Sequence, residues 1–356
     1  QRYDEGTRRL VSIIVLLSYV VIMLPNILYA GAQVFVNIFG IDKMFGISRF
    51  AAIAIVCVAT AIVGSIYAIF GGLKAVAVSD TINGIGLIIG GLMIPFLGFA
   101  ALSAATGGHG IMDGIKYMVE ADPAKMNAIN AWNAPEPEVP WPLIITGMFF
   151  NNLYWWCTNQ SFVQRSLAAK SLKEGQKGAI FCGFLKCLGP LSLVIPGVIA
   201  FYLPSIQDKL AAAGSSAIDF AYPALVSAVV PKPVMGFFAA VMFGAILSSF
   251  NSVLNSSMTL FTLDILPVIS KRKRTDAQLI TIAKRFGIVL CLASIIIAPF
   301  LLYLPAGIST FLNQMWGYYG VPVLAIVVMG ILAPRMPSFA PKVAIIVHIV
   351  CYGLMM

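Results

Sequence analysis

A cluster of hydroxyl and amide side chains lies inside an apolar stretch that is long enough to cross a bilayer. Residues 245–257 hold five serines and two asparagines, and apolar residues flank them on both sides. Lipid offers these groups no hydrogen-bond partner, so they must face protein, water or an ion. Helical spacing places Ala245, Ser248 and Ser249 on one face. Oxygens of this kind are the ligands that a hard cation such as sodium takes; alternatively, the small residues let two helices pack closely.

A second polar set combines amides with large rings. Asn152 and Trp155 lie in the run Asn151-Asn-Leu-Tyr-Trp-Trp-Cys-Thr-Asn-Gln160. Amides bind sugar hydroxyls while ring faces stack on a pyranose, although the rings are also typical of an interfacial aromatic belt. For Gln164 and Arg165, just beyond this run, we favour capping of the inner helix end.

Three further sites carry polar groups into or beside apolar segments. Lys186 either extends its ammonium to the interface, which we favour, or donates to a substrate. Asp80 either caps a helix or forms part of a cation route. Asn313 and Gln314 lie beside aromatic residues and glycines in another span, and glycine-broken helices of this type are typical of transporter binding sites.

Composition excludes an ordinary soluble domain. Hydrophobic residues make up 60% of the 356 residues and charged residues 10%. Apolar runs recur along nearly the whole chain, which predicts a polytopic helical membrane protein. We interpret the net charge of +9 as a sign of membrane orientation, and the six cysteines as small apolar residues. The motifs of metalloproteases, serine hydrolases and P-loop enzymes are missing, so we predict that the chain is not an enzyme.

Nine spans are predicted, at residues 10–41, 48–70, 82–105, 141–160, 178–203, 234–265, 279–302, 308–333 and 343–356. If the N-terminus is cytoplasmic, sixteen of the 23 lysines and arginines lie inside and six outside, with Lys186 within a span. This asymmetry predicts that orientation. The acidic, proline-rich segment 106–140 then forms an extracellular loop with short helices. The chain begins at Gln1 without an initiator Met and stops at Met356 in an apolar run, so we expect a piece of a longer protein.

Several motifs together resemble one transporter family. They are Gly71-Gly-Leu-Lys-Ala-Val76, Asn152-Leu-Tyr-Trp-Trp-Cys-Thr-Asn-Gln160, Gln164-Arg-Ser-Leu-Ala-Ala-Lys170, Phe184-Leu-Lys186 and Ser248-Ser-Phe-Asn-Ser-Val-Leu-Asn-Ser256. The chain resembles the sodium/solute symporter family, specifically its sodium/glucose cotransporter branch, over nearly its whole length.

The resemblance implies an all-α polytopic membrane protein with the LeuT-type inverted-repeat fold, five helices plus five, and substrate near the midplane. Residues 1–105 would be the third to fifth core helices, 106–140 the extracellular loop, 141–334 the sixth to tenth core helices and 335–356 the start of a peripheral helix. The first two core helices would precede Gln1.

The family's site residues carry over position by position. Ala245, Ser248 and Ser249 match its sodium site; Asn152 and Lys186 match sugar contacts; Tyr19 matches an aromatic near the inner sugar exit. A sugar-contacting glutamine falls at Asn313 or Gln314, depending on a gap. Trp155 stands where the family has a tyrosine that covers the sugar. Asp80 with Ser252 resembles a second sodium site of some members, in which Asn251 replaces Ser or Thr.

We therefore expect a sodium-coupled symporter that imports a glucose- or galactose-like monosaccharide by alternating access. Its partners would be the sugar, Na⁺ and the lipid bilayer, without nucleic acid, and its location the bacterial inner membrane. Two alternatives stay open: a symporter of the same family for sialic acid, myo-inositol or another small solute, and a sugar-responsive sensor or channel without coupled transport.

Overall fold

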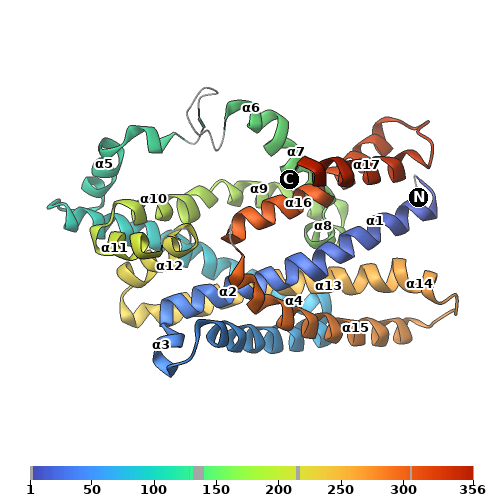
Figure 1. Cartoon of the computed structure of the whole chain (residues 1–356), viewed down its shortest axis with the longest axis horizontal. Helices are drawn as coiled ribbons and strands as arrows, with labels where there is room; N and C mark the ends of the chain where they lie inside the picture. Colours follow the sequence, from blue (N-terminus) through green and yellow to red (C-terminus); the bar gives the residue numbers. More distant parts are fainter. Residues whose placement is uncertain (1–2, 128, 131–139, 214–216, 305–306, 356) are drawn as a thin grey trace.

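The protein is a bundle of long helices, as the computed structural model shows (Figure 1). The structure describes residues 3–127, 129–130, 140–213, 217–304 and 307–355. Within these residues, seven helical segments are long and apolar enough to cross a membrane: Glu5–Phe39, Arg49–Ile66, Ala75–Ala105, Leu172–Tyr202, Lys232–Ile269, Asp276–Tyr303 and Gln314–Leu332. They coincide with seven of the nine predicted spans.

The first part of the chain forms α1 (Glu5–Ser18), the π-helical turn η1 (Tyr19–Met23), α2 (Leu24–Phe39), α3 (Ile41–Phe45) and α4 (Arg49–Ala105). Helix α4 contains two predicted spans, separated by a break at Gly72. Gly72 has φ 64° and ψ −169°, a conformation that side chains with a Cβ avoid. The residues between the predicted spans 48–70 and 82–105 are therefore helical as well, apart from this break. Asp80 lies inside α4 and is not a helix cap.

The next part contains many short helices: α5 (Ile111–Ala121), η2 (Pro123–Met126), α6 (Trp141–Leu143), η3 (Ile144–Met148), α7 (Phe149–Leu153), η4 (Tyr154–Thr158) and α8 (Gln160–Leu167). The predicted span 141–160 is interrupted by two π-helical turns, η3 and η4, and ends at Asn159, where the backbone is extended. Such turns recur at functional sites.

The remainder forms α9 (Leu172–Lys186), η5 (Pro190–Val194), α10 (Ile195–Tyr202), α11 (Pro204–Ala213), α12 (Ala217–Val229), α13 (Lys232–Leu260), η7 (Phe261–Ile265), α14 (Leu266–Ile269), α15 (Asp276–Ile297), η8 (Ala298–Tyr303), α16 (Gly307–Leu332) and α17 (Ala340–Met355). The last predicted span, 343–356, falls in α17, which is a shorter apolar helix.

Helix α13 packs against α4, α2 and α15, and it positions the hydroxyl-rich stretch. Glycines let the neighbouring helices approach closely: a Cβ at Gly31 of α2 would meet Ile246 at 2.8 Å, and one at Gly86 of α4 would meet Val241 at 2.8 Å. Phe250 of α13 is fully buried, and it would lie 3.2 Å from a Cβ at Gly64 of α4. Close packing of apolar side chains fixes α13 against the rest of the bundle.

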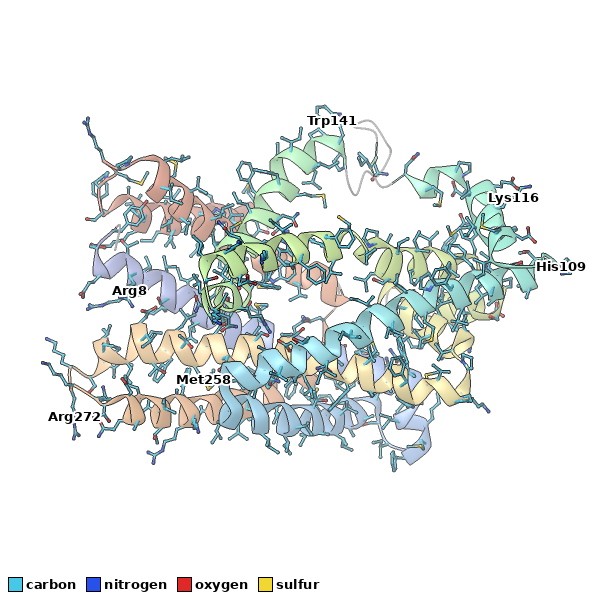
Figure 2. All side chains as sticks on the ribbon, turned by 180° about the vertical axis from the view of Figure 1, so that it is seen from behind. Arg8, His109, Lys116, Trp141, Met258 and Arg272 are labelled. Carbon is cyan, nitrogen blue, oxygen red and sulfur yellow. The ribbon has the colours of Figure 1, made fainter. Side chains whose placement is uncertain are left out.

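The two ends of the bundle carry different parts of the sequence. Arg8 and Arg272 lie at one end, whereas His109 and Lys116 lie at the other (Figure 2). This separation agrees with the charge sorting, which assigns Arg8 and Arg272 to one side of the membrane and Lys116 to the opposite side.

Candidate functional site

The hydroxyl face of α13 offers oxygens without protein partners. Ala245 and Ser248 are half-buried and Ser249 is exposed, in the middle of the apolar segment Lys232–Ile269. Among the described residues, neither the Ser248 nor the Ser249 hydroxyl makes a hydrogen bond, whereas Ser257 farther along α13 donates to its own helix at Val253 O, 2.8 Å. Ser248 and Ser249 stand three and four positions after Ala245, on one side of the helix, where their free hydroxyls can act as ligands of a small cation.

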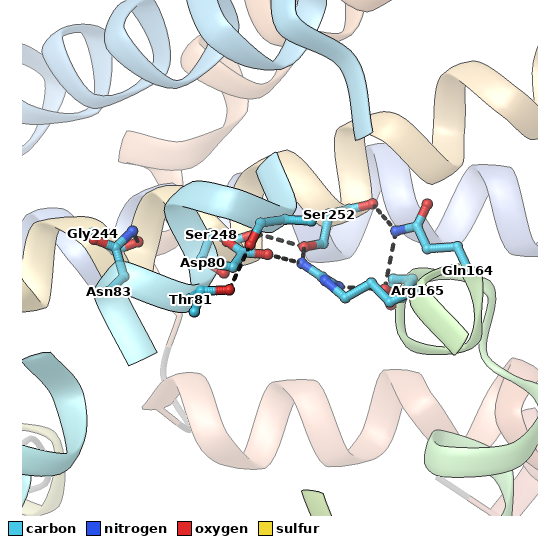
Figure 3. Close-up of polar contacts among 10 residues, drawn as sticks. Asp80, Thr81, Asn83, Gln164, Arg165, Gly244, Ser248 and Ser252 are labelled. Carbon is cyan, nitrogen blue, oxygen red and sulfur yellow. Dashed lines mark hydrogen bonds and ion pairs between the residues drawn. The ribbon is translucent and has the colours of Figure 1, made fainter. Parts of the chain in front are cut away.

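One turn farther along, three helices meet at a charged contact. Arg165 of α8 pairs with Asp80 of α4, and its Nη2 donates to Ser252 Oγ of α13 at 2.5 Å (Figure 3). Ser252 Oγ in turn donates to Ser248 O at 2.6 Å. The guanidinium therefore takes the place between Asp80 and Ser252 that the resemblance gives to a second sodium ion.

Gln164 holds the same contact from the other side. Its Nε2 donates to Ser252 O and Ser161 O, both at 3.1 Å. We expected Gln164 and Arg165 to cap a helix end; instead, both side chains bind α13, because the break at Asn159 turns α8 toward it.

Polar atoms around this contact are buried and lack partners. Asp80 Oδ1, Ser79 Oγ and both side-chain polar atoms of Asn251 make no hydrogen bond within the described residues. Asn251 is fully buried. Unsatisfied buried groups are costly, so their concentration here marks a place that favours water or an ion.

A second site lies between η4, α8 and α9. Lys186 Nζ donates to Asn152 Oδ1 at 2.8 Å, and it lies 4.3 Å from the centre of the Trp156 ring. These three residues line a cavity of about 700 Å³. Lys186 is exposed, and its ammonium points to an amide and a ring; our interpretation that it reaches the membrane interface stays a prediction.

Charge in this cavity is uneven. Its lining includes Arg165, Glu174 and Lys186. Arg165 pairs with Asp80, and Glu174 pairs with Lys177 at 2.9 Å. The charge of Lys186 meets no carboxylate in the described part of the chain, so the cavity presents a positive charge, an amide and an aromatic face together.

Trp155 and Tyr19 lie in an aromatic cluster. The Trp155 ring contacts Trp316 edge-on at 4.6 Å between centroids, and Tyr154 contacts Tyr319 at 6.1 Å. The fully buried Tyr19 donates from its hydroxyl to Asn159 Oδ1 at 2.7 Å, which ties η1 to the break after η4. The structure thus packs Trp155 inside this cluster, whereas its neighbour Trp156 lines the cavity.

Asn313 and Gln314, the two candidates for a sugar contact, fall on α16. The half-buried Gln314 accepts a hydrogen bond at its backbone oxygen from the Tyr352 hydroxyl, 3.2 Å. The side chain of Asn313 lies outside the described residues. The structure therefore brings together Asn152 and Lys186, and separately Asp80 and Ser252, the latter one turn from Ser248.

Two residues of these sites, Trp156 and Arg165, were not identified as site residues from the sequence. Trp156 carried the same signal as Trp155, and a helical period alone does not distinguish them once π-helical turns shift the faces. Arg165 was visible as a charge beside a span, but its partner Asp80 is 85 positions away. Such a pairing depends on tertiary structure.

Comparison with known proteins decides the family. A model of the sodium:solute symporter family matches residues 1–340. The chain belongs to the sodium:solute symporter family. It is 41% identical over 352 residues to the uncharacterised symporter YidK of Escherichia coli (strain K12), a match that covers 99% of this chain and 59% of that protein. It is 30% identical over 365 residues to the sodium/glucose cotransporter of Vibrio parahaemolyticus, covering 98% and 64%.

These matches confirm the resemblance to sodium/solute symporters and their sodium/glucose branch. The chain spans 59% and 64% of the lengths of the two relatives. The family and the seven apolar helices show that the protein is an integral membrane protein.

A solved structure shares the fold. The substrate-bound, outward-open state of a Na⁺-coupled sialic acid symporter matches with a TM-score of 0.75 and 23% identity, over 98% of this chain and 68% of that one. The expected fold class, an all-α polytopic membrane protein of the LeuT type, is confirmed.

Proposed function

We propose that this protein is a sodium-coupled symporter that imports a glucose- or galactose-like monosaccharide by alternating access. The observation that carries the proposal is the pair of free hydroxyls on Ser248 and Ser249, inside an apolar span of a sodium:solute symporter. Of the three buried serines of α13, Ser252 and Ser257 donate to backbone oxygens of their own helix, and Ser256 is fully buried among the packed helices. Hydroxyls left free in such a segment need a partner, and sodium is the partner that the family name supplies.

Sodium bound at Ala245, Ser248 and Ser249 would be coupled to solute transport through a difference in its affinity for the two states of the carrier. An ion that binds one state of the carrier more tightly shifts the population toward that state. If sodium changes the affinity for the solute by some factor, the solute changes the affinity for sodium by the same factor. Asn152, Lys186 and Trp156 would hold the solute in the cavity of about 700 Å³. This volume lies within the range of small-molecule sites.

Other assignments belong to the same proposal. Tyr19 and Trp155 would line the inner exit, and Asn313 or Gln314 would complete the sugar contacts. Residues 1–105 and 141–334 would form parts of the two repeats, 106–140 the outer loop and 335–356 a peripheral helix. We place the protein in a bacterial inner membrane with its N-terminal end in the cytoplasm, since the positive charges gather there.

The experiment is labelled-sugar uptake by cells that express the protein, with and without a sodium gradient. Ser248→Ala and Ser249→Ala should abolish the sodium dependence. Ser257→Ala is the matched control, because it removes a hydroxyl that binds its own helix, and it should transport normally. Unchanged sodium dependence in both test variants contradicts the proposed site. Uptake without a fixed sodium-to-sugar ratio would indicate a channel.

One observation favours a second candidate, an anionic solute such as a sialic acid. The Lys186 ammonium in the cavity pairs with an amide and a ring, so its charge is available to a carboxylate. Competition with a panel of neutral and acidic sugars distinguishes the two candidates. Lys186→Gln should weaken an acidic solute far more than a neutral one. Equal loss for both classes would contradict an anionic substrate.

A further inference from the structure

We propose that the outer face of α15 binds an anionic phospholipid, with the headgroup in a basic crevice at the start of the helix. The crevice has a volume of about 400 Å³ and lies where the loop 270–275 meets the first turns of α15. Its charged lining consists of Arg272, Arg274 and Arg285, and the neutral polar groups of Gln278 and Thr281 complete it.

The arginines of this crevice carry unpaired charge. In the described part of the chain, none of the three forms an ion pair with a carboxylate. Arg274 is held in place by hydrogen bonds from Nη2 to Ser270 Oγ at 2.8 Å and from Nη1 to Ser270 O at 3.3 Å. Asp276, the nearest carboxylate in sequence, lies on the opposite face of the helix by its spacing. Guanidinium groups arranged in this way suit the oxygens of a phosphate.

An apolar stripe continues from the crevice along the same face of α15. Ile288, Val289, Leu292 and Ile296 follow Arg285 at helical spacing, and their side chains are 47%, 59%, 56% and 66% exposed. The opposite face packs into the bundle, where Leu290 is 3% exposed. The stripe therefore faces the surroundings of the protein.

The length of the stripe matches one leaflet. Arg285 and Ile296 are eleven positions apart, which corresponds to ~16 Å along a helix. Half of a hydrocarbon core is ~15 Å thick. A charged crevice followed by an apolar stripe of this length fits a phosphate headgroup and its acyl chain. A soluble phosphate would use the crevice alone.

The location agrees with the charge distribution. Arg272 lies at the end of the molecule that also carries Arg8, opposite His109 and Lys116 (Figure 2). The charge asymmetry of the sequence assigns the segments of Arg8 and Arg272 to the cytoplasmic side, and clusters of basic residues beside a span bind anionic headgroups.

The test is native mass spectrometry of the purified protein in detergent, with phosphatidylglycerol or phosphatidylcholine added. Arg272→Gln/Arg285→Gln should weaken retention of phosphatidylglycerol at least about tenfold. Lys271→Gln/Lys273→Gln is the matched control, since it removes two positive charges from the same segment but none from the crevice lining. It should retain the lipid like the parent protein.

Three outcomes would overturn the inference. Equal weakening in both double variants would indicate general electrostatic attraction. Equal retention of phosphatidylcholine would remove the role of headgroup charge. Displacement of the lipid by glycerol phosphate at the same concentration would remove the role of the stripe. The single variant Arg272→Gln, in the loop before the helix, should give intermediate weakening without touching α15. Solute transport takes no part in this assay, so its result is independent of the proposed function.

Discussion

Replacing Arg165 by Gln should destabilise the protein in a way that sodium partly reverses. The guanidinium pairs with Asp80 and donates to Ser252 Oγ, so it joins α8 to α4 and α13. Its loss leaves the Asp80 carboxylate without a donor on Oδ2, and Oδ1 already lacks one. Asp80→Asn should destabilise the protein less than Arg165→Gln does, because the Arg165 guanidinium keeps Ser252 Oγ and Ser161 O as acceptors.

The exposure of the pair sets the magnitude. The side chains of Arg165 and Asp80 are 33% and 17% exposed, so the pair is neither a surface contact nor fully buried. Exposed pairs contribute up to ~1 kcal/mol, whereas breaking a buried pair costs ~3–5 kcal/mol. We expect a coupling of about 1–3 kcal/mol between the two positions. For a chain of 356 residues that corresponds to a shift of about 1–4 °C in Tm.

The assay is thermal unfolding of Arg165→Gln, Asp80→Asn and the double variant in detergent. Each protein is measured in sodium chloride and in choline chloride at equal ionic strength. The single variants should be destabilised and the double variant should be less unstable than their sum. Sodium should raise the Tm of Arg165→Gln more than that of the parent, because the freed Asp80 carboxylate can accept the ion beside Ser252.

Two results would refute this reasoning. Additive effects of the two substitutions, within ~0.5 kcal/mol, would mean that the ion pair contributes nothing specific. A Tm increment from sodium that is the same in Arg165→Gln and in the parent would mean that the guanidinium does not occupy a cation position.

Three further outcomes follow from other parts of the molecule. Trp156→Ala should weaken solute binding roughly fivefold, measured by equilibrium binding, because the ring lines the cavity and stacking contributes ~1 kcal/mol. Gly86→Ala should destabilise the protein by ~1–3 kcal/mol in thermal unfolding, since its Cβ would meet a valine of α13 at 2.8 Å. Hydrogen bonds from the Lys342 side chain and the Thr7 backbone lower the pKa of Asp4 to about 2. The contact of Asp4, at the start of α1, with Lys342 of α17 should therefore persist down to pH ~4 and open as the pH falls through about 2. Distances between spin labels on the two helices would report this opening.

Two of these outcomes have a control variant, and the third has a result that would contradict it. Gly84→Ala, two positions from Gly86 and with open space around its Cβ, should be neutral or slightly stabilising; equal destabilisation would contradict the close-contact explanation. Asp4→Asn should remove the acid-dependent step, and a step that survives would have another origin. Solute affinity unchanged in Trp156→Ala would exclude the ring from the binding site.

The sequence predicts the spans well and their interruptions poorly. Hydrophobic runs alone place seven spans, because lipid demands a continuous apolar helix of set length. The predicted span ends at residues 70 and 160 fall beside the break at Gly72 and the extended residue Asn159, but the helix that resumes after Gly72 and the π-helical turns inside residues 141–160 were missed, because hydropathy averages over them. Whether a glycine pair ends a helix or only bends it depends on the neighbouring helices.

In the candidate site, too, the sequence identified some residues and left others open. Ser248 and Ser249 were identifiable from the sequence because hydroxyls in an apolar helix stand out. The approach of Lys186 to Asn152 was open, since a lysine near a span end can equally extend to the interface. The sequence could not predict that Trp156 lines the cavity while Trp155 packs against other rings, because the π-helical turn η4 rotates the ring positions relative to an ideal helix.

The central claim is that Ser248 and Ser249 bind sodium, and equilibrium binding of radioactive sodium to the purified protein without sugar tests it most directly. The account predicts saturable binding in the parent and in Ser257→Ala, and its loss in Ser248→Ala/Ser249→Ala. Saturable binding that is unchanged in the double variant would contradict it.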